Sequence, residues 1–451
     1  MQTEFHIGID DTDSRLAGCT THTAALLFQE LVTKGFKPLD FPWLVRLNPN
    51  IPWKTRGNGA LSLRFSIEEA ELEEAKKIAV ATVERTTDLA QRGTDPAVVF
   101  LKGRVSNPWR EFSARALHDI LSVREALQIA KSAGTEIRLL KGSRGLVGAL
   151  ASVGADFDRD HTFEIIAYRT PENIGTTRRV SLDSVRQMDT TFRGLTFNNI
   201  DPETGRVLIC PHGPDPVLLG IRGEDPTSVT RAMNQLEIDE PIERVMIFKT
   251  NQGTDAHLSC HRRIEALRPY QSTSVIGIVG SAPRIVRGGH VIFRIDDETG
   301  SVDCAAYRAT GHVCETALHL APGDSVTVSG GIRPQPWGEL TINVEKLEVT
   351  SLVDTVRLEN PSCSNCGNRC ESMGRGQGFR CRKCKARFPR TARVEKLEHR
   401  KIARGVYLPP PRVHRHLTKP ASRAGIRRPT SFETSNANID QNLESLASIA
   451  S

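Results

Sequence analysis

The spacing of apolar residues changes several times along the chain and predicts segments of different structure. Over residues 1–142, short apolar runs alternate with stretches in which apolar residues recur every three or four positions, the patterns of strands and amphipathic helices. We expect a strand at 5–9, a helix from about 20 to 32, and one long helix over 109–133. Further elements are expected as strands at 43–47, 60–67, 98–101 and 136–140 and a charged helix at about 68–90. Strands that alternate with helices predict a mixed α/β domain over 1–142.

The pattern changes twice more before the cysteine-rich region. Residues 143–265 show the order strand, helix, strand, strand, helix, strand, which predicts a ferredoxin-like domain with an interrupted second strand over 195–200 and 206–210. Residues 270–352 hold five strand-like runs with Gly-rich joints and a short helical piece between the third and fourth. This predicts an OB fold, with a generic small β-barrel or sandwich as the alternative. The expected fold class is a multidomain protein that combines α/β and β domains.

Charge is distributed unevenly along the 451 residues, whose net charge is +7. Residues 363–430 contain 19 Lys and Arg against 3 Asp and Glu, whereas residues 1–362 have a net charge of −6. An acidic body with a strongly basic C-terminal region predicts a polyanionic partner held at one end. Residues 396–451 are basic and then polar, so we expect a flexible tail there. Two roles stay open for residues 400–430, a further grip on the polyanion or a tolerated disordered tail.

Composition excludes several classes of protein. No stretch approaches about 18 consecutive apolar residues, so no membrane-spanning helix and no membrane partner are expected. The first residues lack the basic and apolar regions of a secretory signal. Ten cysteines are few for this length, and five lie between Cys363 and Cys384, which favours metal binding in a reducing cytoplasm over a disulfide framework.

The cysteines are the clearest chemical signal. Two Cys-x2-Cys pairs separated by fourteen residues predict a zinc ribbon over 358–395, with the ligands Cys363, Cys366, Cys381 and Cys384. All four tetrahedral positions would be filled, so the zinc would be structural. Cys370 is left over, and coincidental or redox-active thiols are the alternative. The many arginines and lysines around these cysteines would suit a nucleic-acid backbone.

A second signal lies just after the first predicted strand. Asp10, Asp11 and Asp13 follow it directly, and carboxylates at the end of a strand suit divalent cations that in turn hold phosphates. Thr20 stands where the next helix begins, and free N–H groups at a helix start attract phosphate. A solvated acidic turn and an ordinary helix cap are the alternatives.

Two loops combine cations with glycine and suit phosphate. Neither is a Walker A loop, because the chain has no Gly-x4-Gly-Lys-Ser/Thr sequence, and an ordinary hairpin turn is an alternative for the first. Their candidate phosphate-binding residues are Lys54, Arg56, Gly57, Asn58, Gly59, Lys141 and Arg144.

Taken together, the motifs resemble the archaeal tRNA 2-agmatinylcytidine (agmatidine) synthetase family over about 1–390. The resemblance is carried by Gly-Ile-Asp-Asp-Thr-Asp-Ser at 8–14, Cys-Thr-Thr at 19–21, Lys-Thr-Arg-Gly-Asn-Gly at 54–59, Arg-Gly-Leu-Val-Gly-Ala-Leu at 144–150, Thr-Phe-Asn-Asn at 196–199, Pro-His-Gly-Pro-Asp-Pro-Val at 211–217 and Asn-Gln-Gly-Thr-Asp at 251–255. It implies an ATP-binding, kinase-like catalytic domain over 1–142, followed by the ferredoxin-like, OB and zinc-ribbon domains.

The resemblance also implies a reaction. An enzyme of this family would use ATP to attach agmatine at the 2-position of the wobble cytidine of the isoleucine tRNA with a CAU anticodon, so that AUA is read. Phosphorylating the 2-oxygen would make it a leaving group, and phosphoryl transfer is mostly positioning and charge neutralisation. By this likeness Asp10, Asp11 and Asp13 would manage Mg²⁺ and phosphates, and Thr20 would be the family's autophosphorylated threonine. Agmatine is a dication, and Asp215 and Asp255 are candidates to bind it.

One other function remains open from the sequence. An OB fold with a zinc ribbon is also common in non-catalytic proteins that bind single-stranded nucleic acid. The clustered carboxylates after the first strand favour the ligase, because a binding protein has no evident use for them beside a polyanion.

Overall fold

The first half of the chain builds one large sheet with helices on both faces. A computed structural model describes residues 2–14 and 18–426. The sheet has the order β6-β5-β1-β4-β3-β10-β7-β9-β8, with β2 paired to β4. Its N-terminal strands are β1 (Gln2–Asp10), β2 (Lys37–Pro38), β3 (Trp43–Arg46), β4 (Gly59–Glu68), β5 (Ala97–Lys102) and β6 (Glu136–Leu139). The accompanying helices are α1 (Thr20–Thr33), α2 (Leu72–Thr86), α3 (Asn107–Ala116), α4 (Val123–Ser132) and α5 (Gly145–Val153).

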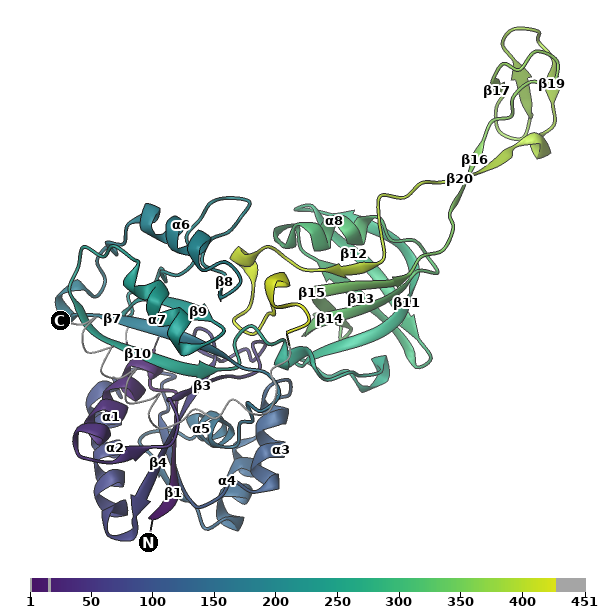
Figure 1. The fold of residues 1–451 in the computed structure, drawn as a ribbon. Helices are drawn as coiled ribbons and strands as arrows, with labels where there is room; N and C mark the ends of the chain where they lie inside the picture. Colours follow the sequence, from purple (N-terminus) through teal and green to yellow (C-terminus); the bar gives the residue numbers. More distant parts are fainter. Residues whose placement is uncertain (1, 15–17, 427–451) are drawn as a thin grey trace.

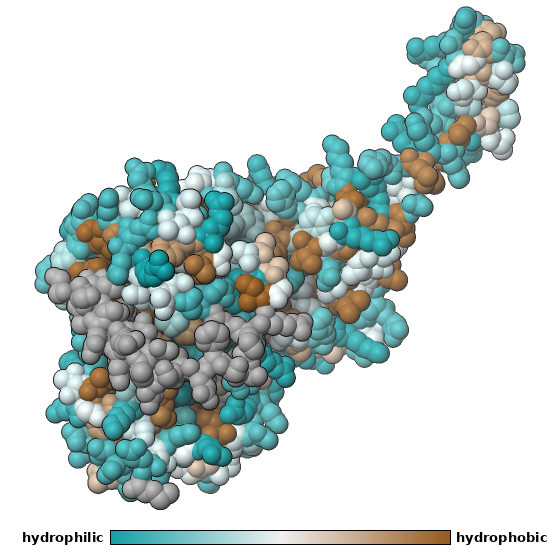
Figure 2. All heavy atoms as spheres, viewed as in Figure 1, coloured by the Kyte–Doolittle hydropathy of each residue, from teal (hydrophilic) through white to brown (hydrophobic). Residues whose placement is uncertain are grey.

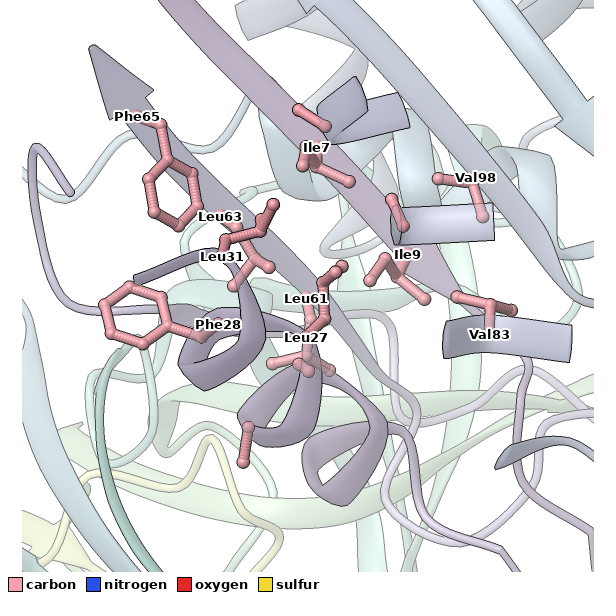
Figure 3. Packing of buried hydrophobic residues seen from close by; sticks show 14 of the residues in the cluster. Ile7, Ile9, Leu27, Phe28, Leu31, Leu61, Leu63, Phe65, Val83 and Val98 are labelled. Carbon is pink, nitrogen blue, oxygen red and sulfur yellow. The ribbon is translucent and has the colours of Figure 1, made fainter. Parts of the chain in front are cut away.

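Alternation along β1 directs its apolar side chains to one face of the sheet and leaves a glycine on the other. Ile7 and Ile9 are fully buried against α1 and α2, as Figure 3 shows with Leu27, Phe28 and Leu31. Each such side chain stabilises the fold by about 1.5–3 kcal/mol when fully buried. Gly8 faces the other side, where a Cβ would lie 2.2 Å from the carbonyl oxygen of Ala149 in α5. The missing side chain lets α5 pack directly on β1 and brings its N-terminus to the end of that strand.

The helix expected over 109–133 is two helices, α3 and α4, so that prediction is wrong. The intervening turn is held by contacts outside the helices, because the carboxylate of Asp119 accepts hydrogen bonds from Arg262 at 2.8 Å and Gln271 at 2.7 Å. Ser122 then caps α4 by accepting from the backbone N–H of Glu125. The cap was visible in the sequence, whereas the partners of Asp119 lie more than 140 residues away.

The second half of the large sheet has the ferredoxin-like topology. Its strand order β10-β7-β9-β8 places the fourth strand beside the first and the third beside the second. The elements are β7 (Thr162–Arg169), α6 (Leu182–Thr191), β8 (Thr196–Phe197), β9 (Val217–Gly223), α7 (Pro226–Asn234) and β10 (Ile242–Thr250). The interrupted second strand differs from the prediction, because only Thr196 and Phe197 of β8 pair with β9. The two halves expected over 195–200 and 206–210 instead fold back on each other, with an antiparallel bridge between Ile200 and Val207.

The two half-sheets join through a short parallel contact, in which Lys249 and Thr250 of β10 pair with Trp43 and Leu44 of β3. One face of the ferredoxin-like sheet packs against α6 and α7. The other face contributes Ile166, Tyr168 and Phe248 to the core that contains α1. The domains therefore share a core, and the strands on either side of the junction end near one another.

The next domain is the predicted OB fold. Strands β11 (Ser272–Val286), β12 (His290–Asp297), β13 (Gly300–Ala306), β14 (Ser325–Pro334) and β15 (Leu340–Ser351) form its barrel. Pairing of β13 with β15 closes it, and α8 (His312–Leu318) lies between the third and fourth strands.

The zinc ribbon stands away from the body on a two-stranded stalk (Figures 1 and 2). The stalk pairs β16 (Val356–Glu359) with β20 (Val394–Leu397). The ribbon itself contains β17 (Cys370–Ser372), β18 (Phe379–Cys381) and β19 (Arg387–Phe388). No helix among the described residues has the length and apolar character needed to cross a membrane.

The prediction of a flexible tail from residue 396 is wrong for the part that the structure describes, which ends at residue 426. After the stalk the chain returns to the body, where β21 (Gly405–Tyr407) adds to the barrel sheet beside β15. It then runs between the OB and ferredoxin-like domains (Figure 1). We call residues 405–426 the C-terminal segment. Arginines of this segment form ion pairs with carboxylates far away in the sequence, and the residues around these arginines did not indicate such pairs. Residues 427–451, the rest of the predicted tail, lie outside the described part.

Candidate active site

A cavity of about 800 Å³ lies where the two half-sheets meet. The end of β1, the start of α1, and the loop between β3 and β4 line it from the N-terminal domain. The strands β7 and β9, with the loop before β9, line it from the ferredoxin-like domain. Of the residues predicted from the sequence, those that line it are Asp10, Asp11, Asp13, Thr20, Lys54, Arg56, Gly57, Asn58, Gly59, Arg144 and Asp215.

The carboxylates of Asp10 and Asp11 are held in a buried and negatively charged corner. Burial, followed by the charge of Asp11, raises the pKa of Asp10 well above its usual range. Burial also raises the pKa of Asp11 to about 7, although its carboxylate accepts a hydrogen bond from the backbone N–H of Asp95. Gly148 of α5 makes room here, because a Cβ there would lie 1.8 Å from a carboxylate oxygen of Asp10. The corner therefore favours a cation.

Thr20 is the first residue of α1, and its hydroxyl group points at a carboxylate. It is 5% exposed, and its Oγ1 lies 3.4 Å from Oδ1 of Asp13, which also accepts from Thr55 at 2.9 Å. Cys19, not Thr20, occupies the N-cap position, and it makes no capping hydrogen bond through its side chain. An ordinary helix cap therefore does not explain this threonine, which is placed as a hydroxyl beside a carboxylate.

Arg56 links the two sides of the cavity. Its guanidinium lies 3.9 Å from the carboxylate of Asp13 and 3.8 Å from that of Asp215. The loop that carries it is tightly bent, with φ of +40° at Arg56 and +51° at Asn58. A side chain at Gly57 would collide with His416 and Arg46. The glycine-containing motif therefore serves a close approach of the loop to other chain segments.

The structure brings only one cation of the second predicted loop to the cavity. Arg144 lines it and donates to Asp95 at 2.9 Å. Lys141 donates instead to the carbonyl of Gln91 at 2.6 Å and lies outside the lining.

The two candidates for agmatine are separated. Asp215 is 5% exposed and lines the cavity, with the guanidinium of Arg178 at 3.3 Å. Asp255 lies elsewhere, because its carboxylate accepts from Lys346 at 2.9 Å and from the backbone N–H of Lys419 at 2.7 Å. The motif at 251–255 holds the C-terminal segment.

Sequence reasoning missed Glu164, Arg222 and His416, which all line the cavity. Glu164 of β7 is 4% exposed and accepts from Arg222 at 3.0 Å and from Gln252 at 2.5 Å. A glutamate within the apolar run of β7 was a usable signal. No signal in the sequence pointed to His416, since it lies almost 200 residues after β9 in the chain.

The zinc site is the one place in the described chain where three or more metal-ligand side chains converge. The sulfur atoms of Cys363, Cys366, Cys381 and Cys384 lie within 4.8 Å of one another, and Cys370 is not among them. Backbone N–H groups, that of Cys384 first, lower the pKa of Cys381 to about 6, which favours a thiolate. The set fits a tetrahedral structural zinc as predicted.

Comparison with known proteins covers nearly the whole chain. Family models for the TiaS TCKD domain, the TiaS FLD domain, an OB-fold nucleic acid binding domain and the TiaS C-terminal zinc ribbon domain match residues 6–141, 143–257, 274–350 and 360–402, respectively. The isoleucine-tRNA 2-agmatinylcytidine synthetase TiaS of Pyrococcus horikoshii is 43% identical over 416 residues, covering 92% of this chain and 96% of that protein. The protein of the same name from Archaeoglobus fulgidus is 40% identical over 421 residues, with 93% and 97% covered.

Solved structures agree with this similarity. A complex of TiaS with its isoleucine tRNA and ATP superposes with a TM-score of 0.84 at 37% identity. A complex of TiaS with the same tRNA, AMPCPP and agmatine gives 0.81 at 34%. A ZRD-deleted mutant of TiaS in complex with agmatine gives 0.72 at 30%. Each covers 94% of this chain and 98% of the other.

Proposed function

The chain belongs to the TiaS family of isoleucine-tRNA 2-agmatinylcytidine synthetases, and from this premise we propose which residues carry out its reaction. It is an ATP-dependent ligase that joins agmatine to the 2-position of the wobble cytidine of the isoleucine tRNA with a CAU anticodon. Its partners are that tRNA, agmatine and ATP. A non-catalytic binding protein, the alternative from sequence, does not account for the family or for the cavity.

We assign phosphate chemistry to residues 1–142, agmatine binding to 143–265, and tRNA binding to the OB fold at 270–352 and the zinc ribbon at 358–395. The observation that supports this division is the single cavity that contains both Asp11 of the first domain and Asp215 of the second. We further propose that the reaction takes place in the cytoplasm, as the tRNA-modifying activity of the family suggests.

Phosphoryl transfer needs the negative corner to be neutralised. Mg²⁺ would do this when bound, held by one or two of the carboxylates of Asp10, Asp11 and Asp13 together with ATP phosphates and water. The carboxylate oxygens do not converge as a preformed cage among the described residues, which suits Mg²⁺, since it usually takes only one or two carboxylates and completes its shell with phosphates and water. Lys54, Arg56 and Arg144 would offset the remaining phosphate charge. Gly57, Asn58 and Gly59 shape the loop that presents Arg56.

Thr20 is our candidate for a residue that accepts a phosphoryl group. Its hydroxyl donates toward Asp13, so that carboxylate is placed to take the proton as the new P–O bond forms. The bond from that phosphorus to the bridging oxygen of ATP breaks in the same step, and the remaining nucleotide leaves. For the tRNA, a phosphoryl group on the 2-oxygen of the cytidine converts that oxygen into a leaving group. The ammonium end of agmatine gives up a proton, and the resulting amine attacks carbon 2. The C–O bond breaks, phosphate departs, and the nitrogen of the new C–N bond loses a second proton.

Agmatine fits the ferredoxin-like side of the cavity. Asp215 supplies a buried carboxylate for one cationic end, and Ile166, Ile209 and Val217 supply apolar walls for the four methylenes. The complex of agmatine with a ZRD-deleted TiaS supports a site that does not need the ribbon. Asp255 is not part of this proposal, because Lys346 and Lys419 already occupy its carboxylate.

A substitution pair tests the assignment. Asp215→Asn should raise the KM for agmatine by about tenfold or more, because removing a buried charge partner costs roughly 1.5–3 kcal/mol, while the KM for ATP stays unchanged. Asp255→Asn is the matched control and should leave both constants within about twofold. An unchanged agmatine KM in Asp215→Asn, or the larger effect in Asp255→Asn, would remove Asp215 from the agmatine site.

A further inference from the structure

A second hollow adjoins the active-site cavity where the C-terminal segment crosses it. Its volume is about 320 Å³, and the residues that line both it and the larger cavity are Arg46, Leu47, Lys54, Arg56, Gly57 and His416. We call it the basic hollow, because arginine and lysine side chains line it and no described Asp or Glu does. Its charged and imidazole lining consists of Arg46, Lys54, Arg56, His414, Arg415 and His416.

The C-terminal segment is fixed on both sides of the basic hollow. On one side Arg412 pairs with Asp201 at 3.0 Å and with Glu203 at 2.6 Å. On the other side Arg423, 1% exposed, pairs with Asp160 at 2.9 Å and Glu224 at 2.6 Å.

Backbone hydrogen bonds complete the attachment between these anchors. The N–H groups of Gly253 and Asp255 donate to the carbonyls of His416 and Leu417 at 2.9 and 2.8 Å. Residues 414–417 are therefore held in a set position at the edge of the catalytic cavity.

The cations of the basic hollow have weak compensation within the protein. Arg415 reaches Glu345 only at 3.7 Å, and Arg56 reaches its two carboxylates only at 3.8–3.9 Å. Lys54 donates to a neutral carbonyl, that of Arg56, at 2.7 Å. The Nε of Arg46 is buried without a hydrogen-bond partner among the described residues.

The positive charges of the basic hollow repel one another and lower the pKa of two of its side chains. Burial first, then the charges of Arg415, Arg333 and Arg46, lowers the pKa of Lys54. Arg46 and burial lower the pKa of His416 well below its ordinary value. Like charges gathered around a cavity that contains no carboxylate favour an anion with several acceptor oxygens.

We propose that the basic hollow binds one phosphodiester group of the tRNA strand next to the reacting cytidine, with Arg415 of the C-terminal segment as a principal contact. This deepens the proposed function and rests on it. ATP is the other source of phosphate. A Mg²⁺-bound triphosphate, however, suits the carboxylate corner at Asp10 and Asp11, whereas a phosphodiester needs cations alone. A flipped cytidine in the cavity also requires its flanking phosphates to lie close by.

The test combines a protein variant with a modified tRNA. Arg415→Gln is suitable because the Arg415 side chain is 39% exposed, so the fold should tolerate the change. It should weaken binding of the CAU isoleucine tRNA about tenfold and lower the slope of log K against log salt by about one. Arg404, which lies directly before the C-terminal segment, is exposed. Arg404→Gln is therefore the matched charge control and should change the affinity for the tRNA by less than about twofold.

A neutral methylphosphonate at one linkage beside the cytidine locates the contact. At the linkage that the hollow binds, the modification should weaken binding to the unmodified protein but have little further effect on Arg415→Gln. Additive effects at both flanking linkages, equal losses in Arg404→Gln, or no loss at all would overturn the proposal. An increased KM for ATP with unchanged tRNA affinity would assign the hollow to ATP and also overturn it.

The two proposals fail separately. Absence of agmatine incorporation by the unmodified protein would remove the proposed function, whereas the binding measurements need no turnover. Equal unfolding temperatures of Arg415→Gln and the unmodified protein establish that the affinity change is local.

Discussion

Asp11→Asn should stabilise the N-terminal domain while it abolishes the reaction. Burial raises the pKa of the Asp11 carboxyl from 3.8 to about 7. Below about pH 4 the group is protonated in the folded and unfolded states alike, so it has no effect on stability. Between pH 4 and pH 7 the unfolded chain loses the proton first, and the free energy of unfolding falls as pH rises. Above pH 7 the whole penalty is present.

The size of the penalty follows from the shift. Three pKa units correspond to about 4 kcal/mol at 1.36 kcal/mol per unit, an upper limit because part of the carboxylate is solvated. Even half of it would raise the unfolding temperature of Asp11→Asn at pH 8 by about 4 °C or more for a domain of this size. Mg²⁺ with ATP should reduce the difference, because both bind the folded, charged form of the unmodified protein.

Calorimetric unfolding of both proteins between pH 5 and pH 9, without Mg²⁺, measures the effect. Incorporation of labelled agmatine should fall by at least about 100-fold in the same variant, because the neutral amide cannot balance the metal and phosphates. Glu74→Gln, which neutralises an exposed carboxylate of the same domain, should change neither quantity. Equal stability of Asp11→Asn and the unmodified protein at every pH would refute the buried negative corner as a functional device.

Three further substitutions probe other parts of the account. Arg423→Ala removes a buried guanidinium that pairs with both Asp160 and Glu224, so we expect a loss of about 3–5 kcal/mol. The loss should be read as hundred-fold or faster amide exchange over 416–423 with the OB fold unaffected, and unchanged exchange would contradict the anchoring role. Cys381→Ser should lower the zinc content and weaken tRNA binding with a smaller salt slope, while agmatine binding persists, and equal tRNA affinity would exclude the ribbon as an RNA grip. Gly148→Ala should reduce turnover more than tenfold by displacing Asp10, whereas Gly300→Ala, whose Cβ meets nothing closer than 3.5 Å, should not; equal activities would argue against the tight corner.

Local patterns predicted the parts of the fold that depend on near neighbours. The alternation along β1, the ferredoxin-like order and the paired cysteines are all visible within short stretches, and the structure confirms the fold class they imply. The single helix over 109–133 failed because the partners of Asp119 are far along the chain. The join between β3 and β10 rests on two residue pairs, too few to leave a pattern in the sequence.

The active site was predictable only in part for the same reason. Asp11 and Thr20 stand in a compact motif at a strand end and a helix start. Asp255 also stands in a compact motif, which suggested a binding site. Its carboxylate instead binds the C-terminal segment, which its basic composition had led us to predict as a flexible tail. His416 reaches the cavity, and Arg415 the adjoining basic hollow, because Arg412 and Arg423 pair with carboxylates about 200 residues earlier. No local property of 405–426 indicates that return.

The most direct measurement of the central claim is the incorporation of radiolabelled agmatine into the isoleucine tRNA with a CAU anticodon, with zinc-loaded full-length protein, Mg²⁺ and ATP. We expect label at the wobble cytidine that depends on ATP and disappears in Asp11→Asn, although that variant still binds the tRNA. Folded protein that incorporates no agmatine, or that incorporates it without ATP, would contradict the account.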